Sequence, residues 1–422
     1  MRALLVTSVL VLSACWSEQQ FTRDCVAAGH CVVDDAGATG GGSETGGGGG
    51  ATGGGGGGTL EIVDSGLQPG AFSVSWAQVA AELFDAGVGT VPGVDDAQFT
   101  LSVITVFPTT ATKWIGGVLG PSGSVYCIPY SSTGALEVLE VLPNDTLRTM
   151  AVPGTSWGWE GGVLMPDGTV IGLPNSASDL LIIPTDGGPP RVLDIGLRLL
   201  AGSGTFEGGV VTSTGRLWLA PSSSPVAVSW VPGELPRAVT LPSSGLDKAY
   251  AGAVLLADGA SVLMVPREAA SGVVVDGAGV VSSFTLSGYS GGLLLPFNGV
   301  MLFPNSSPQR PFMEWRDLNL SPTTKQSSGY FGGAWSTNGF GYALQTDGAS
   351  GRAVILAPDG ELAEPSLGST EVSSASHYGL VGRPDGSLVA CPYASRNVLV
   401  FTPNARRTVS LQASSSPWLN HW

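Results

Sequence analysis

The chain has few charged residues, few basic residues and very few histidines for its length. Only 12% of its 422 residues are charged, and 18 Lys and Arg against 33 Asp and Glu give a net charge of −15. A nucleic-acid-binding surface needs basic patches that neutralise phosphates, so this balance excludes nucleic acid as an expected partner. The sequence also has no H-E-x-x-H, Walker or EF-hand pattern. We therefore predict no catalytic residues, no cofactor and no metal.

Long apolar runs are missing, and the longest one near the N-terminus is short. Met1 and Arg2 precede the apolar run Ala3–Leu12. This run is too short to span a bilayer and is typical of a signal peptide. The sequence LSAC that ends at Cys15 resembles the lipobox of bacterial lipoproteins. The resemblance implies a signal peptide over 1–14 and a palmitate-type diacyl anchor on Cys15. An ordinary signal peptide whose cleavage happens to leave a Cys is the alternative.

The resemblance to lipoproteins also implies a location. Trp16 follows Cys15, where the family's usual signal for retention in the inner membrane is Asp. We therefore expect an outer-membrane lipoprotein that faces the periplasm or the cell surface, with the membrane as a partner through the lipid anchor.

Segment 15–58 is expected to form a tether behind the lipidated Cys15. Cys25 and Cys31 flank a short polar loop, and an oxidising compartment favours a disulfide between them. A metal site there would need more ligands than His30. From Asp34 to Gly58 nearly every residue is Gly, Ser, Thr, Ala or acidic, a composition typical of disorder. Segment 59–100 follows as an N-terminal extension with one short helix expected over 76–84.

Glycine and turn residues are abundant, and they recur in a pattern that organises the rest of the chain. The stretch GGVLMPDGTVIGLP from Gly161 reads as a β-hairpin, in which Asp167-Gly168 would form a two-residue turn with positive φ at both positions. Seven copies begin at Gly116, Gly161, Gly208, Gly252, Gly291, Gly332 and Gly379, so they are 39 to 47 residues apart. Seven units in register indicate a repeat architecture.

The repeat predicts an all-β fold, a seven-bladed β-propeller of four-stranded antiparallel blades over 101–422. In the second unit the two outer strands are expected over 180–183 and 191–197. Either 101–107 or 408–412 is expected to complete the last blade by pairing with the other end of the chain. Cys127 and Cys391 occupy second strands but are offset by one residue, so they should point to opposite faces. We expect buried free thiols there rather than a bridge.

The hairpins resemble those of several propeller families. The double glycine is similar to kelch repeats, and the Pro-Asp-Gly-x-Val half is similar to NHL and streptogramin-lyase repeats. No Trp-Asp dipeptide recurs, so the repeat does not resemble WD40. Streptogramin lyases use His and Glu with a metal, whereas these repeats contain only His377, so the lyase site is not carried over.

Two positions next to the first glycine of each repeat are candidates for ligand binding. Two residues before it lies an aromatic residue or His, which either packs between inner strands or forms a collar suited to sugars or flat ligands. One residue before it, Glu160 and Glu207 are acidic in adjacent blades, where they could act as acid and base or bind a cation. The candidate ligand-binding residues are Trp114, Trp159, Glu160, Phe206, Glu207, Tyr250, Tyr289, Tyr330 and His377.

A third repeated feature lies on the same face, where polar residues such as Tyr130, Asn175, Ser222 and Tyr393 follow the second strand. These are either turn residues or a polar rim. We expect a cell-envelope lipoprotein that presents a propeller as a module for an unknown protein or glycan ligand. The alternatives are an envelope lyase or hydrolase that uses Glu160, Glu207 and His377, and a structural subunit of an envelope complex.

Overall fold

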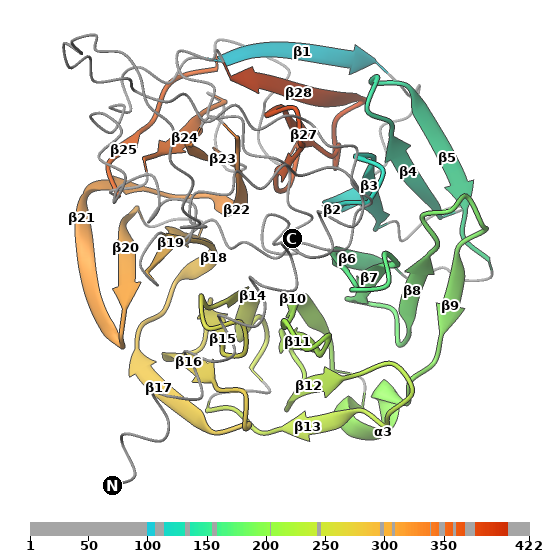
Figure 1. Ribbon diagram of the computed structural model, residues 1–422. Coiled ribbons are helices and arrows are strands. Elements are labelled where there is room, and N and C mark those ends of the chain that lie inside the picture. Colours follow the sequence, from blue (N-terminus) through green and yellow to red (C-terminus); the bar gives the residue numbers. More distant parts are fainter. Residues whose placement is uncertain are drawn as a thin grey trace, which may run out of the picture. The chain divides into compact units, whose positions relative to one another are not determined.

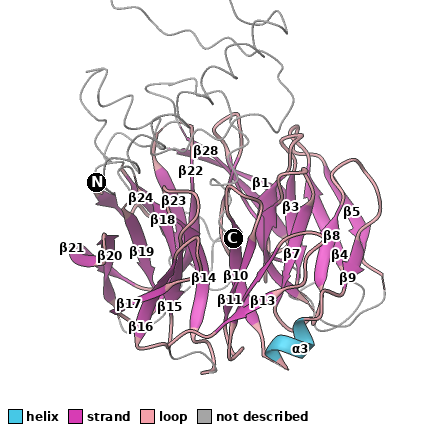
Figure 2. Ribbon diagram, turned by 60° about the horizontal axis from the view of Figure 1, so that its bottom comes forward, coloured by secondary structure: helices cyan, strands magenta, loops and turns pink. Residues whose placement is uncertain are grey.

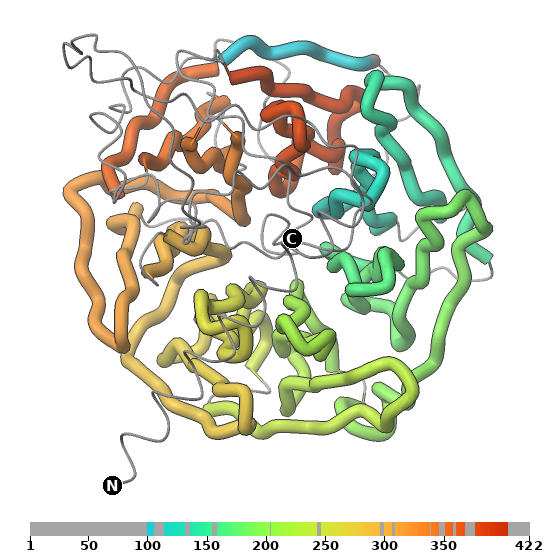
Figure 3. The backbone as a smooth tube through the Cα atoms, in the orientation of Figure 1, coloured from blue at the N-terminus to red at the C-terminus, as the bar shows by residue number. Residues whose placement is uncertain are grey.

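The computed structural model describes residues 99–403 except for short segments at 106–113, 131–135, 154–157, 203, 243–245, 296–298, 306–308, 338, 346–350, 358–359 and 368–375. It confirms the predicted fold: seven four-stranded antiparallel sheets stand around a common axis (Figure 1). The backbone trace follows the blades around the ring in chain order (Figure 3). No helix of the described segments is long and apolar enough to cross a membrane.

We number the blades in chain order. Blade 1 comprises β2 (Trp114–Leu119), β3 (Val125–Pro129), β4 (Glu137–Val141) and β5 (Leu147–Ala151), and blade 2 comprises β6 (Trp159–Leu164), β7 (Val170–Pro174), β8 (Leu180–Ile183) and β9 (Arg191–Leu193). Blade 3 comprises β10 (Phe206–Val211), β11 (Leu217–Pro221), β12 (Ala227–Trp230) and β13 (Arg237–Val239), and blade 4 comprises β14 (Tyr250–Leu255), β15 (Val262–Pro266), β16 (Ser271–Val275) and β17 (Val281–Thr285).

Blade 5 comprises β18 (Tyr289–Leu294), β19 (Val300–Pro304), β20 (Arg310–Arg316) and β21 (Asn319–Ser327), and blade 6 comprises β22 (Tyr330–Trp335), β23 (Gly341–Gln345), β24 (Ala353–Leu356) and β25 (Leu362–Ala363). Blade 7 comprises β26 (Val381–Gly382), β27 (Leu388–Ala390), β28 (Asn397–Pro403) and β1 (Phe99–Thr105). Viewed from the side, the strands of each blade run from one face of the ring to the other (Figure 2).

The last strand of blade 2 is shorter than predicted. β9 ends at Leu193, and the short helix α3 (Leu197–Ala201) takes up the end of the predicted strand and continues beyond it. The Asp194 carboxylate accepts a hydrogen bond from the Gly196 N–H at 2.7 Å, and Gly196 has a φ of 80°. This Asx turn redirects the chain before the predicted strand could reach Leu197.

The hairpin turns differ from the predicted two-residue turn. In blade 2 the Gly168 N–H donates to the Met165 carbonyl, and the Met165 N–H donates to the Thr169 carbonyl, both at 2.9 Å. Only Gly168 has positive φ, at 84°. A two-residue turn at Asp167-Gly168 would need the residue before it to donate an N–H to the Thr169 carbonyl, and Pro166 has no N–H. The result is a three-residue loop that ends in a left-handed glycine.

A β-bulge explains why the first glycine occurs in every copy. In blade 1, Trp114 is opposite Pro129 and Gly117 is opposite Cys127, so two residues, Ile115 and Gly116, face one residue of β3. The same shift occurs in the inner hairpins of blades 2 to 6. Gly116 has a φ of 71°, and the equivalent glycine has positive φ in six of the seven blades. Glycine is the residue that takes this conformation without strain.

The core is distributed over seven junctions between neighbouring blades. Each of the seven buried hydrophobic clusters contains residues from two adjacent blades, and together they cover every junction of the ring. β11 shows how alternation produces this arrangement. Leu217 and Leu219 face blade 2, whereas Trp218 and Ala220 face blade 4. Both faces of a blade are therefore apolar.

The N-terminal strand completes the ring. β1 pairs antiparallel with β28 over seven residue pairs, from Phe99–Pro403 to Thr105–Asn397. The prediction that one end of the chain completes the last blade is confirmed for the N-terminal end, with β1 beginning two residues earlier than expected. Segment 408–412, the other candidate, lies outside the described residues.

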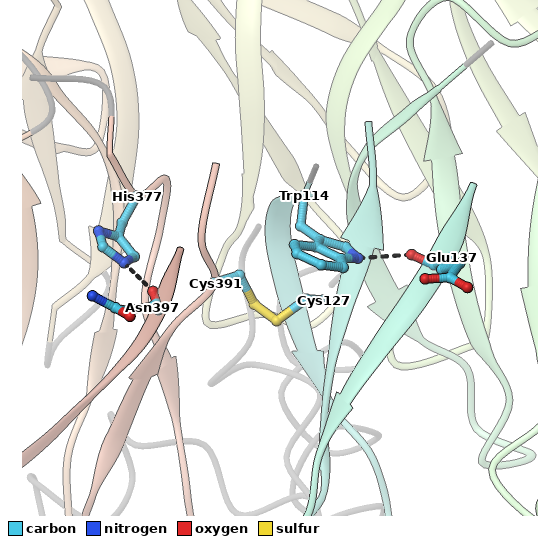
Figure 4. The surroundings of a disulfide bond; sticks show 6 residues. All are labelled: Trp114, Cys127, Glu137, His377, Cys391 and Asn397. Atoms are coloured by element: carbon cyan, nitrogen blue, oxygen red, sulfur yellow. Dashed lines mark hydrogen bonds between the residues drawn. A yellow bond between two sulfur atoms is a disulfide. The ribbon is translucent and has the colours of Figure 1, made fainter. Parts of the chain in front are cut away.

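The expectation of free thiols at Cys127 and Cys391 is wrong. The two form a disulfide with Cα atoms 5.7 Å apart, across 264 residues of sequence (Figure 4). The one-residue offset does place them on opposite faces of the repeat. However, neighbouring blades contact each other through opposite faces. Cys391 lies on the face that blade 7 turns toward blade 1, and Cys127 lies on the face that blade 1 turns toward blade 7, so the two sulfurs meet at the junction. A Cβ on Gly117 would lie 2.8 Å from Cys391 Sγ, so this glycine makes room for the bridge.

An ion pair links the same two blades. Arg383 donates from Nη1 to Asp145 Oδ1 at 2.6 Å and from Nη2 to the Leu142 carbonyl at 3.0 Å. The Arg383 side chain is 3% exposed, whereas the Asp145 side chain is 44% exposed. A buried guanidinium needs such partners, so this contact fastens the β26–β27 turn of blade 7 to the β4–β5 turn of blade 1.

Candidate functional site

The residues two before the first glycine are buried at the blade junctions. Their exposed fractions are between 0% and 3%, and the aromatic ones belong to the clusters described above. The structure therefore places these side chains in packing positions, where they present no ring face to a ligand. They are Trp114, Trp159, Phe206, Tyr250, Tyr289, Tyr330 and His377.

Polar atoms on these buried rings bind within the protein. Trp114 Nε1 donates to the Glu137 carbonyl at 2.7 Å, and Trp159 Nε1 donates to the Asp179 carbonyl at 2.6 Å (Figure 4 shows the first). The three tyrosines of the set use their hydroxyls in the same way, with partners Pro242 O, Pro311 O and Glu364 Oε1. The partners hold each ring in place across its blade, as expected for buried polar atoms.

His377 holds the equivalent place in blade 7. Its Nε2 lies 2.7 Å from the Asn397 carbonyl (Figure 4), and its Nδ1 lies 2.9 Å from Ser376 Oγ. A carbonyl accepts only, so Nε2 carries the proton and Nδ1 accepts from the Ser376 hydroxyl. Burial lowers the pKa of His377 to about 4. In the described part of the chain no hydrogen bond or ion pair joins His377 to Glu160 or Glu207, and both ring nitrogens are occupied by partners next to blade 7.

The residue immediately before the first glycine has a different environment. It is one of the two bulge residues, and bulges re-aim side chains that would otherwise lie in the regular ladder. None of the seven residues at this position belongs to an interblade cluster, although all except Glu160 and Tyr378 are buried. In chain order they are Ile115, Glu160, Glu207, Ala251, Ser290, Phe331 and Tyr378.

The structure brings Glu160 and Glu207 into one electrostatic unit. Asn175, which follows β7, donates from Nδ2 to Glu160 Oε2 at 2.7 Å. Ser222, which follows β11, donates to Glu207 Oε2 at 3.3 Å. Arg267, which follows β15, donates from Nη1 to Glu207 Oε1 at 2.7 Å. The carboxylates on the inner strands thus meet polar residues at the ends of the second strands.

Four aromatic rings continue from Arg267 through the last blades to blade 1. The Arg267 guanidinium lies 5.4 Å from the centroid of the Phe331 ring. Phe331 and Tyr378 have ring centroids 4.9 Å apart, Tyr378 and Tyr393 have centroids 4.8 Å apart, and both pairs are edge-to-face. Tyr393 and Tyr130 follow at 6.0 Å. We call the set of seven the axial cluster: Tyr130, Glu160, Glu207, Arg267, Phe331, Tyr378 and Tyr393.

The pKa values in the axial cluster are shifted by burial and by mutual charge. Burial and the negative charge of Glu207 raise the pKa of Glu160 well above its usual range, against the opposing effect of Arg267. Burial also raises the pKa of Glu207, and Arg267 and Ser222 act against this rise. Burial and then the charge of Glu160 raise the pKa of Tyr130 and Tyr393. Glu160 is therefore close to both phenols.

Several groups of the axial cluster remain available to a ligand. Glu160 has an amide partner at Oε2 but, among the described residues, no cationic partner. Within that part of the chain, no hydrogen bond holds the hydroxyls of Tyr130 and Tyr393. Glu160, Tyr130, Tyr378 and Tyr393 are all partly exposed. This combination can offer a carboxyl group, two hydroxyls and aromatic surface to a bound molecule.

Sequence reasoning identified part of this cluster. It singled out the two glutamates and the residues that follow the second strands, but it did not single out Arg267 or assign Phe331 and Tyr378 to a site. Arg267 occupies the same position after a strand-ending proline as Tyr130, Asn175 and Ser222, which is the signal that could have found it.

Other predicted sites cannot be placed. Cys15, Cys25 and Cys31, the linker to Gly58 and the predicted helix over 76–84 lie outside the described residues. Within the described segments, no group of three or more His, Cys, Asp or Glu could hold a metal ion. The large apolar side chains exposed on the described surface come from separate elements: Val103, Leu199, Leu235, Leu246, Val280 and Leu318.

Comparison with known proteins identifies the fold alone. No protein-family model and no curated protein sequence matches the chain. Virginiamycin B lyase from Staphylococcus aureus is similar in structure, with a TM-score of 0.58 and 11% identity over 72% of this chain and 99% of the lyase. Its catalytically inactive variant with quinupristin gives a TM-score of 0.59 over the same shares. The WD40 repeats of RRP9 give 0.52 and 10% identity, over 75% of this chain and 99% of theirs.

Proposed function

We propose that this protein is a ligand-binding β-propeller and that its ligand, a protein or glycan segment or a small molecule, contacts the axial cluster. The supporting observation is the convergence of six blades on one set of side chains. Blades 2, 3 and 4 supply Glu160, Glu207 and Arg267, while blades 6, 7 and 1 extend the set with aromatic rings. Binding sites combine apolar surface with a few oriented polar groups, which is the composition of this set.

A thermal-shift screen against glycans, peptides and metabolites tests the proposal. The wild type is compared with a Tyr378→Ala/Tyr393→Ala variant, which removes two adjacent rings of the cluster. A control variant, Leu199→Ala/Leu235→Ala, removes two exposed apolar side chains elsewhere. A ligand of the axial cluster stabilises the wild type and the control but not the tyrosine variant. If every stabilising compound acts equally on all three proteins, the axial cluster is not the binding site.

An acid–base enzyme is a second candidate, and the coupled carboxyl groups favour it. Pairs of carboxyl groups with different pKa values, so that one is protonated while the other is ionised, are typical of lyases and hydrolases. Here burial and the charge of Glu207 raise the pKa of Glu160 well above its usual range and favour the protonated acid, whereas the ion pair with Arg267 opposes the rise in the pKa of Glu207. Turnover of chromogenic glycoside, ester or lactone substrates should fall by about 100-fold or more in Glu160→Gln, as expected for loss of a general acid. Equal turnover in wild type and variant contradicts this candidate.

We also propose that the propeller is an outer-membrane lipoprotein anchored through Cys15. The N-terminal pattern carries this proposal, and the disulfide between Cys127 and Cys391 supports it, because such bonds persist in oxidising compartments outside the cytoplasm. Radioactive palmitate should label the wild type but not Cys15→Ser, and the variant should leave the membrane fraction. Labelling that survives in Cys15→Ser rejects the anchor.

A further inference from the structure

We infer that the ligand of the axial cluster carries an organic ammonium group, which sits between the carboxylate of Glu160 and the rings of Tyr130, Tyr378 and Tyr393. This inference rests on the proposed function and adds the chemical class of the ligand. Both free amines and the side chain of a lysine in a peptide supply this group.

The first argument is the charge balance of the site. Both cations that act on Glu207 lie on the side of that carboxyl group: Arg267 is paired with it through a 2.7 Å hydrogen bond, and Lys248 acts on it through its charge. Asn175, the partner of Glu160, is a neutral amide. Arg267 acts on Glu160 through its charge, but among the described residues no cation forms an ion pair with Glu160. A partly buried carboxylate is costly unless it is paired, and a ligand with a positive charge would supply that partner.

The second argument is the surface that surrounds Glu160. The charge of Glu160 acts on both Tyr130 and Tyr393, and Tyr378 packs edge-to-face against Tyr393 with centroids 4.8 Å apart. The face of a tyrosine ring carries negative potential and attracts a cation within about 6 Å of its centroid. At the opposite end of the same row of rings, Arg267 already stacks on Phe331 in this manner. The Tyr130 end of the row has no such cation among the described residues.

These features disfavour the other ligand classes. An anion would face two carboxyl groups, and Arg267 is already committed to one of them. A neutral saccharide would stack on the rings but would leave the charge of Glu160 uncompensated. The net charge of −15 also favours the approach of cations over anions.

Calorimetric titration of the full chain with four matched probes tests the inference. The probes are benzyltrimethylammonium, benzylamine, neutral benzyl alcohol and benzoate. The two cations should bind at least about tenfold more tightly than benzyl alcohol, a ratio equivalent to 1.4 kcal/mol, and benzoate should not bind. A blocked tripeptide with a central lysine is the additional arm that distinguishes a peptide source from a free amine.

The pH dependence identifies the group that receives the cation. Benzyltrimethylammonium keeps its charge at every pH, so any change in affinity comes from the protein. The cation binds ionised Glu160, whose pKa is raised, so affinity should increase as pH rises through that pKa and then level off. Glu207, Arg267, Tyr130 and Tyr393 are the other titratable groups around Glu160, and Lys248 acts on Glu207.

Three variants separate the carboxylate from the rings. Glu160→Gln should remove both the preference for cations and the pH dependence, whereas Glu268→Gln, which removes an exposed carboxylate after Arg267, should change neither. Tyr393→Phe keeps the ring and should retain binding of the quaternary probe, and Tyr393→Ala should weaken it about tenfold, as for loss of a strong cation–π contact. Circular dichroism confirms that each variant is folded.

The outcomes distinguish this inference from the proposed function. If benzyl alcohol binds as tightly as the cations and Tyr393→Ala weakens both, the ammonium class is rejected while the axial cluster remains a binding site. Absence of binding by either cation at about 10 mM, a concentration at which even weak contacts register, also rejects the class. If cations bind equally to wild type, Glu160→Gln and Tyr393→Ala, both the class and the location are rejected.

Discussion

At the scale of single residues, the bulge at the start of each inner strand separates two functions of neighbouring side chains. The residue two positions before the first glycine packs at a junction between blades, as Trp159 does. The residue one position before it lies outside the packed faces of the blade, as Glu160 does. The glycine supplies the left-handed backbone that makes this change possible, with a φ of 66° at Gly161. A local backbone irregularity therefore decides which side chains can meet a ligand.

The second glycine of the pair has a different role, and this leads to a stability prediction. A Cβ on Gly209 would lie 2.3 Å from the Trp218 carbonyl oxygen, a backbone atom that cannot move aside without breaking the hairpin. Gly209→Ala should lower the free energy of unfolding by about 2–3 kcal/mol, the range for overpacked sites. Gly188→Ala is the control, since its nearest atoms are the side chains of Asp186 and Pro184 at 3.2 and 3.3 Å. Urea unfolding measures both, and equal effects would contradict the clash.

The buried carboxyl group of Glu160 predicts how stability depends on pH. Its pKa is higher in the folded state than in the unfolded chain, so the folded protein holds the proton more tightly. The resulting contribution to the free energy of unfolding is complete below about pH 4.3, the ordinary pKa of a Glu side chain. It is lost as pH rises through the pKa of Glu160 in the folded protein. The wild type should therefore lose stability relative to Glu160→Gln as pH increases across that window. Urea midpoints of both proteins from pH 4 to 8 measure this, and parallel curves would rule it out.

At the scale of elements, β1 is the strand on which ring closure depends. Its partner β28 lies at the other end of the described chain, and the two form seven residue pairs. Phe99 packs edge-to-face on Phe401 with centroids 5.7 Å apart, and Leu101 packs against the cluster between blades 6 and 7. β28 would be an unpaired edge without β1, and exposed edges of this kind promote aggregation.

Two truncations test the role of β1. Removal of residues 1–106 deletes β1, whereas removal of residues 1–90 retains it. The shorter truncation should unfold cooperatively at a temperature close to that of the full chain. The longer one should melt at a lower temperature and self-associate, which differential scanning calorimetry and size-exclusion chromatography measure. Identical melting of the two truncated proteins would show that blade 7 is stable with three strands.

The elements also show how far the sequence could predict the structure. The glycine spacing predicted the number of blades and strands, because a hairpin with a turn glycine and a bulge glycine repeats as a local unit. The turn type was predicted incorrectly because it was inferred from Asp167-Gly168 alone. The preceding Pro166 has no N–H, which a two-residue hairpin turn would need at that position. The disulfide was missed because the relation between Cys127 and Cys391 depends on which faces meet between blades 7 and 1. The contact between Arg267 and Glu207 likewise joins different blades, and no local pattern contains it.

At the scale of the whole molecule, blades 1 and 7 are joined by a disulfide and an ion pair with a buried guanidinium, and blade 7 is itself completed by the pairing of the two ends of the described chain. The chain-entropy treatment of a loop of several hundred residues gives about 5 kcal/mol of stabilisation from the disulfide. Opening any junction in the ring would expose the faces of two blades. The two ends of the described chain meet inside blade 7, where β1 pairs with β28, and the junction of this blade with blade 1 carries the disulfide and the ion pair.

A double-mutant cycle measures this link. Cys127→Ala, Cys391→Ala and the double variant should each lower the free energy of unfolding by about 3–5 kcal/mol, the range for native disulfides. The double variant should cost little more than either single variant, because one substitution already breaks the bond. Adding reductant should bring the wild type to the level of the variants. Additive single effects would show that packing of the sulfurs, rather than the bond, accounts for the loss.

The pairing of β1 with β28 sets the order in which the chain can complete its fold. During synthesis, Thr105 is made 292 residues before Asn397, the residue opposite it, as the difference between their numbers shows. β1 therefore has to wait for almost the entire polypeptide before it can dock, and the six intervening blades form with both ends of the row still open. The disulfide between Cys127 and Cys391 can form only equally late, because both thiols must be present before they are oxidised together. Any nascent chain that stops short of blade 7 can neither seat its first strand nor form the bond that seals the circle.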